Sequence, residues 1–141
     1  MNLSSRVKIT KCADYTGAGT SDVEGTILDM SGYEGVLFIA SFGTPAANNT
    51  LHAQQDTDVA GGAMADLLGT SVGVGASDED VWLDVHKPRE RYVRAVADRG
   101  TSTTLECLIA IQYGARNMPV DNAVAGTIHG EQHTSPIEGT A

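Results

Sequence analysis

The feature that most constrains this fold is a two-residue alternation of apolar and polar side chains in the second half of the chain. Residues 80–87 read DVWLDVHK, and similar runs occupy 91–99 and 104–114. Because successive side chains of a strand point to opposite faces, this alternation predicts three half-buried strands. Short connections separate them, and Pro88 lies in the first connection. We therefore predict an antiparallel meander.

The third run has a regular pattern of its own. Its odd-numbered side chains are predicted to share one face of the strand, and these are Leu105, Cys107, Ile109, Ile111 and Tyr113.

Four earlier segments also carry strand signals. Residues 6–12 place Val7 and Ile9 on one face, and 25–32 and 50–56 are further candidates. Residues 35–43 read GVLFIASFG, a continuously apolar run that predicts a central strand covered on both faces.

The connection between the middle strands contains AMADLLG at 63–69. A helix of about seven residues is marginal by itself, so we interpret this segment as a long connection with a short strand or turn. Whether 63–69 is helical stays open from sequence alone.

The whole pattern indicates an all-β protein. The chain has 141 residues, the size of one domain, with 16 glycines that favour frequent turns. It shows no sustained helical periodicity. We predict an antiparallel β-sandwich, jelly-roll-like, over residues 1–114.

Residues 115–141 form a polar segment that is predicted to be an extended C-terminal arm docking on a neighbouring subunit. Folding back on its own domain is the alternative. Six spaced side chains are the expected contacts of this arm: Met118, Pro119, Val120, Val124, Ile128 and Ile137.

The charge distribution limits the partners. A formal net charge of −9 argues against nucleic acid and anionic membranes, which attract basic surfaces. The N-terminal segment MNLSSRVKIT has no apolar core of a secretion signal. Two oppositely charged patches are predicted to meet between subunits, or else to be solvated turns. They consist of Lys87, Arg89 and Arg91, and of Asp78, Glu79 and Asp80.

No motif indicates catalysis, so we predict no enzyme activity and no cofactor or metal. Residues 56–66 resemble a calcium loop only in their first positions, and turn-forming aspartates are the simpler interpretation. His129 and His133, or His52 and His86, lack further ligands.

Two cysteines and the single tryptophan are further candidates for a structural or binding role. Cys12 and Cys107 lack metal-ligand spacing and are predicted to be reduced, buried thiols. Trp82 lies on the polar side of its run and is either core of the opposite sheet layer or an interface anchor.

Several stretches of the C-terminal two-thirds have a familiar form. They are Leu51 to Asp58, Lys87 to Val96, Thr101 to Thr104, Ile111 to Val120, and His133 to Ala141. In these stretches the chain resembles small virion proteins of tailed bacteriophages, most of all capsid decoration or cement proteins.

The resemblance implies a jelly-roll-like sandwich that binds the outer surface of an icosahedral head and clamps subunits of the major capsid protein. It implies location on the capsid surface, assembly in the host cytoplasm and no catalytic residues. Self-association as a dimer or trimer is expected alongside it. Two alternatives are a neck, tail or fibre component, and a sugar-binding jelly roll. The latter predicts exposed aromatics and paired carboxylates, which the 5% aromatic content disfavours.

Overall fold

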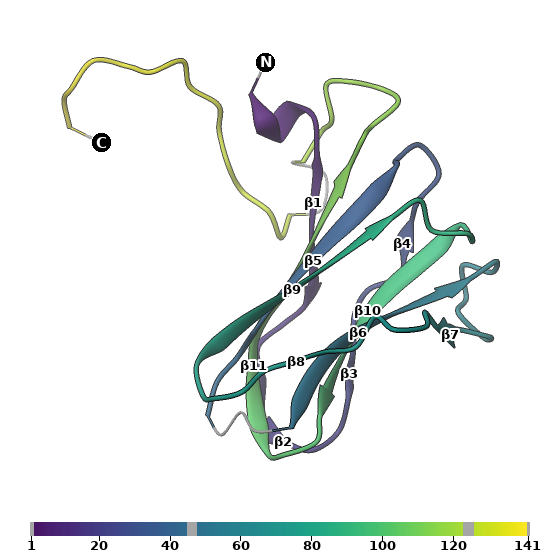
Figure 1. The fold of residues 1–141 in the computed structure, drawn as a ribbon. Coiled ribbons are helices and arrows are strands. Elements are labelled where there is room, and N and C mark those ends of the chain that lie inside the picture. The colour runs from purple at the N-terminus through teal and green to yellow at the C-terminus, as the bar shows by residue number, and fades with distance from the viewer. Residues whose placement is uncertain (1, 45–47, 123–125, 141) are drawn as a thin grey trace.

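The computed structural model describes residues 2–44, 48–122 and 126–140. Two antiparallel sheets pack face to face as a β-sandwich (Figure 1). The chain begins with a short 3-10 helix, η1 (Leu3–Ser5). The strands are β1 (Lys8–Ala13), β2 (Thr16–Gly19), β3 (Val23–Glu24), β4 (Leu28–Asp29), β5 (Gly35–Phe42), β6 (Asn49–Asp56), β7 (Ala65–Asp66), β8 (Val72–Gly73), β9 (Glu79–His86), β10 (Tyr92–Arg99) and β11 (Thr103–Tyr113).

Each sheet is built from strands that are distant in sequence. Sheet A has the order β1-β11-β5-β9, with β2 also paired to β11. Sheet B has the order β3-β10-β6-β7, with β4 paired to β10 and β8 paired to β6. Strands β1 and β9 therefore lie at opposite edges of sheet A. No helix in the described ranges is long and apolar enough to cross a membrane.

The predicted strands are confirmed in position, but the meander is wrong. Strands β9 and β11 both pair with β5 in sheet A, whereas β10 pairs with β6 in sheet B. Each of these strands has an apolar inner face, and packing two sheets about 10 Å apart buries those inner faces against one another. The two connections cross between the sheets, where a meander would have closed hairpins.

Two local assignments also differ from expectation. Strand β2 forms within a Gly-rich stretch that reads as a loop. The buried Arg99 stabilises it, because the guanidinium donates hydrogen bonds to the carbonyls of Gly17 and Ser21 at 2.7 and 2.6 Å. Residues 63–69 contain strand β7 and turns, as the short-strand interpretation predicted.

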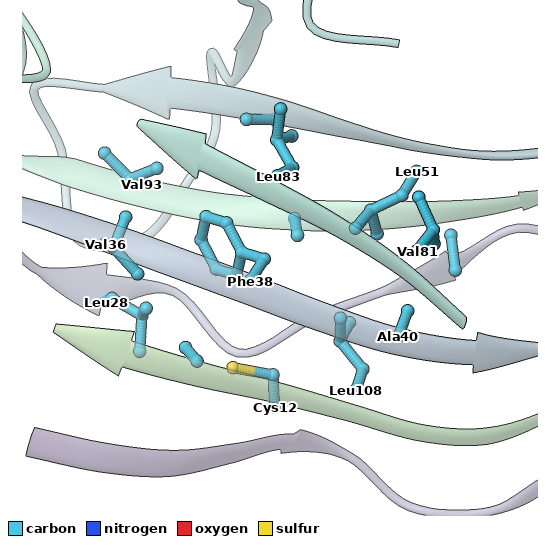
Figure 2. Packing of buried hydrophobic residues seen from close by; sticks show 14 of the residues in the cluster. Cys12, Leu28, Val36, Phe38, Ala40, Leu51, Val81, Leu83, Val93 and Leu108 are labelled. Carbon is cyan, nitrogen blue, oxygen red and sulfur yellow. The ribbon is translucent and has the colours of Figure 1, made fainter. Parts of the chain in front are cut away.

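The core lies between the sheets. Its side chains come from both inner faces, and Figure 2 shows Phe38 among them near the middle of the packed layer. Val81 and Leu83 point inward and are buried, as the alternation in β9 predicted. Phe38, Leu51 and Leu108 are wholly buried, so one continuous core spans the two sheets.

A β-bulge in β11 changes which side chains share a face. The register shifts between Leu105 and Cys107, so Leu105 lies in the core while Cys107 lies half-buried on the outer side. The extra residue of a bulge reverses the alternation, which the sequence pattern did not indicate. Cys12 is a free, buried thiol, and burial raises its pKa to about 12. The expectation of burial therefore holds for Cys12 but not for Cys107.

Candidate interaction surface

The outer face of sheet A carries a continuous apolar surface. Residues directly opposite one another on neighbouring strands share a face. The first such row joins Ile9, Ile111 and Leu37, and the second joins Ile109, Ile39 and Trp82. We call these six residues the outer patch. Ile9 thus faces outward, whereas Val7 precedes the strand and is buried.

The outer patch explains the apolar run in β5. The inward side chains Val36 and Phe38 have no exposed surface, whereas Leu37 and Ile39 on the opposite face are only half-buried. The prediction that this strand is covered on both faces is therefore wrong for the single chain. A continuous apolar run is thus compatible with an apolar outer surface as well as with a second covering layer.

Trp82 is the most exposed member of the outer patch, at 67% of its full accessibility. Its assignment to the core of the opposite layer is wrong, because Trp82 projects from the outer face of β9. It borders a shallow groove with Leu37 and Ile39. Asp80 and Asp84 flank it on the same face.

Both of these carboxylates have partners within the chain. The Ser41 hydroxyl donates to Asp80, and the Tyr113 hydroxyl donates to Asp84 at 2.8 Å. Tyr113 crosses Gly35 on the intervening strand, where any side chain would collide with the tyrosine ring and hydroxyl. Burial, assisted by the neighbouring Asp84, raises the pKa of Tyr113 to about 12.

The acidic patch lies at the start of β9. Asp78 is exposed, and Asp80 opens the outer face of the strand. Glu79 has an internal role, because its carboxylate accepts hydrogen bonds from the amides of Gly75 and Ala76 at 2.6 and 3.0 Å. Glu79 thereby holds the turn that leads into the strand.

The basic patch follows the other end of β9. Lys87, Arg89 and Arg91 are exposed and border a groove together with Arg116. Arg91 forms a two-point ion pair with Asp29, at 3.0 and 2.8 Å. These hydrogen bonds hold the pKa of the Asp29 carboxyl well below its usual range. Within one chain the two patches are separated by the length of β9, so their contact between subunits stays a prediction.

The C-terminal segment, residues 115–140, contains no helix or strand among its described residues. Its first part contacts the N-terminal segment of the same chain. The Val120 amide donates to the Ser5 carbonyl at 2.8 Å, and the Asn122 amide group donates to Ser4 and Val7 carbonyls at 2.8 and 3.0 Å. The folding-back alternative therefore describes this first part.

The predicted contact residues of this segment have different environments. Met118 and Pro119 are exposed, and Val120 and Ile128 are half-buried where they border a groove with Ile9. Val124 lies outside the described residues. Ile137 is 94% exposed. The C-terminal end of the segment lies away from the two sheets (Figure 1). Residues 133–140 are exposed throughout.

The outer face of sheet B is polar. His52 contacts Asp98 through Nδ1 at 2.8 Å, and Arg94 forms a two-point ion pair with Glu24. His52 and His86 lie on different sheets, so the structure does not bring them together. In the described part of the chain, no three His, Cys, Asp or Glu side chains form a group that could hold a metal ion.

The aspartates of the calcium-like loop bind backbone amides. Asp56 accepts from Asp58 and Ala63 at 3.0 and 2.9 Å, and Asp58 accepts from Ala60 at 3.0 Å. They are turn-forming side chains, as the simpler interpretation predicted. The amides also lower the pKa of Asp56.

Comparison with known proteins assigns this chain to no family. The chain matches no protein-family model, and a search of curated proteins finds no relative.

Proposed function

We propose that this protein is a capsid decoration or cement protein of a tailed bacteriophage, which binds the outside of the head and stabilises it. The outer patch is the observation that carries this proposal. A surface of five aliphatic side chains and one exposed tryptophan on a sheet is typical of a protein-binding face. The stretches that resemble phage virion proteins supply the capsid as the partner.

The outer patch would lie against the major capsid protein. Burying apolar surface contributes about 25 cal/mol per Å², and tryptophan is enriched among residues that dominate binding energy. Trp82, with most of its surface free, would then be the main anchor at one edge of the outer patch. Because the protein would bind only the assembled shell, its binding free energy would favour assembly.

The exposed end of the C-terminal segment would act as the strap. Asn122 and Val120 fix the first part to the protein's own N-terminal segment, which leaves residues 133–140 without a covering surface. An extended chain is ordered when its backbone groups and spaced side chains find a partner, here a neighbouring subunit. Ile137 would be its apolar contact.

We also propose that the sandwich is a jelly roll. When β1 with β2, β3 with β4, and β7 with β8 each count as one interrupted strand, eight strands remain. Successive strands then alternate between the sheets except at the step from β6 to β7. The orders β1-β11-β5-β9 and β3-β10-β6-β7 are those expected of two interlocked Greek keys.

Binding to emptied heads tests the proposal. Ile109→Asp places a carboxylate in the outer patch and should abolish binding, whereas Leu68→Asp is the matched control, because Leu68 is fully exposed away from the patch. Deleting residues 134–141 should weaken binding without abolishing it. Unchanged binding of the Ile109→Asp protein would overturn the proposed surface.

The number of copies per particle tests the location. Hundreds of copies per particle are expected for a shell protein, whereas six or twelve would place it in the neck.

One observation favours a second candidate, a sugar-binding module. Trp82 is exposed and flanked by two carboxylates, an arrangement on which a sugar ring stacks. Both carboxylates are already bonded within the chain, to Ser41 and Tyr113. Binding on a glycan array that is lost in Trp82→Ala would support this candidate over the capsid.

A further inference from the structure

The edge of sheet A formed by β9 is open. Within the described residues β9 pairs only with β5, so one side of its backbone has no strand hydrogen-bonded to it. The opposite edge differs, because the Ile9 amide of β1 donates to the Asn122 side chain at 2.7 Å. The C-terminal segment therefore occupies the β1 edge and leaves β9 as the edge where another strand can add.

One hydrogen bond identifies the backbone groups that face the open edge. The Lys87 amide donates to the Glu34 carbonyl at 2.7 Å, and the pairing of β9 with β5 continues without a register shift. In an antiparallel ladder, residues bonded to the neighbour alternate with residues facing away. The amides and carbonyls that face away therefore belong to Asp80, Trp82, Asp84 and His86.

Apart from the carboxylates of Glu79, Asp80 and Asp84, this edge lacks the features that usually prevent strand addition. Proteins protect edges with proline, lysine, bulges or very short strands. Residues 79–86 contain no proline or lysine, and the ladder with β5 has no bulge. Left-handed backbone at Asp78 (φ 57°) and Lys87 (φ 52°) turns the chain at each end, which defines the length available for pairing.

The charges at the two ends of β9 indicate the occupant. The strand starts in the acidic patch and ends in the basic patch, so the same strand turned end for end is its electrostatic complement. We propose that two copies of the chain pair through β9 about a two-fold axis, forming an antiparallel β9–β9 ladder that joins their A sheets.

Charge and hydrogen-bond geometry select one register. Outward-facing residues must pair with one another, which leaves few choices. Placing the axis at Leu83 pairs Asp80 with His86 and Trp82 with Asp84, and brings Lys87 opposite Glu79. Moving the axis to Trp82 would set Asp80 directly opposite Asp84 twice, a destabilising arrangement of like charges.

The ladder would double the outer patch. Edge pairing continues the sheet, so both outer faces lie on the same side of the pair and Trp82 of each copy lies near the axis. This inference gives a specific form to the dimer that is one of the expected modes of self-association. It does not depend on a capsid, because the isolated protein would form the pair.

Sedimentation of the isolated protein tests the pairing. The full chain should reach twice its 14.7 kDa mass as concentration rises. One variant reverses the acidic end (Asp78→Lys with Asp80→Lys), and the other reverses the basic end (Lys87→Glu with Arg89→Glu). Each alone should weaken the dimer at least about tenfold, because like charges then meet twice.

Mixing the two variants provides the decisive readout. Opposite charges face one another at both ends of a mixed pair, so mixing should restore dimers to near the unmodified level. A mixture no better than its components would overturn the end-for-end arrangement. A chain that stays monomeric at about 1 mM, the weak end of specific association, would overturn the dimer altogether.

Cysteine pairs test the register. In a Cys107→Ser background, Trp82→Cys mixed with Asp84→Cys should form an intermolecular disulfide, since paired Cα atoms lie about 5.5 Å apart, within disulfide range. Trp82→Cys alone should not. Self-linking of Trp82→Cys would overturn the register. A dimer that forms but does not bind heads would refute the proposed function alone, whereas a monomer that binds heads would refute this inference alone.

Discussion

At the scale of single residues, the environments of similar side chains differ sharply. The basic residues between 87 and 99 are close in sequence, yet Arg91 is ion-paired at the surface and Arg99 is buried. Lys87 and Arg89 remain exposed in the basic patch. These basic residues are separated because the chain passes from sheet A to sheet B between β9 and β10 and because side chains alternate between the faces of β10. Their spacing in the sequence therefore did not show which of them share a surface.

Arg99 should be the most sensitive of these residues. It donates to the carbonyls of Gly17, Ser21 and Thr103 without any acidic partner among its hydrogen bonds. Arg99→Met removes charged hydrogen bonds and leaves buried acceptors unsatisfied, so we expect a loss of about 3 kcal/mol or more in unfolding free energy. Urea unfolding measures this loss. Arg89→Met, at an exposed position, should change stability by less than about 0.5 kcal/mol.

The Tyr113 hydroxyl, whose ring lies across Gly35, should lose its proton at a higher pH than an ordinary tyrosine. Its pKa of about 12 has burial as the main cause and Asp84 as a secondary cause. Replacing the carboxylate in Asp84→Asn should therefore move the pKa only part of the way back toward about 10. Near-ultraviolet titration of the four tyrosines measures it. Asp80→Asn is the matched control, and an equal shift there would contradict the assignment to Asp84.

At the scale of elements, local pattern predicted where the strands lie but not which strands are neighbours. Alternation located β9, β10 and β11 because burial of one face is a local property of the sequence. β9 pairs with β5, whose residues lie about forty positions earlier in the sequence. The short connections from β9 to β10 and from β10 to β11 had instead predicted that consecutive strands pair with one another. The bulge beside Cys107 lies in the pairing of β11 with β5, which the alternation in β11 did not indicate, whereas the alternation in β9 did place Trp82 on the polar side of its run.

The loop after β6 should respond to acid. Its amides at Asp58 and Ala63 bind the Asp56 carboxylate and lower its pKa. The stabilisation is complete above the ordinary aspartate pKa of about 3.9, and it is lost as pH falls through the lower value of the folded state. Amide chemical shifts of Asp58 and Ala63 should follow one midpoint below 3.9. In Asp56→Asn this midpoint should vanish, and its persistence would implicate another group.

At the scale of the whole molecule, one sheet combines an apolar outer face, an open edge and a partly exposed C-terminal segment. Sheet B carries a polar outer face with ion pairs satisfied within the chain. Among the described residues, the outer face of sheet A is therefore more apolar than that of sheet B. The continuous apolar run of β5 contained this information, but only the second sheet's position shows which face it leaves open.

The C-terminal segment should divide into a part that stabilises the fold and a part that does not. Asn122 bonds to Ser4, Val7 and Ile9, so Asn122→Ala should cost about 1–3 kcal/mol, which lowers the melting temperature by several degrees. Residues 134–140 are exposed, so deleting 134–141 should leave the melting temperature within about 1 °C, like other surface changes. Calorimetry of the two variants measures both effects. A large drop on deletion would mean that the terminal residues belong to the fold of their own chain, and the strap on a neighbour would then lose its physical basis.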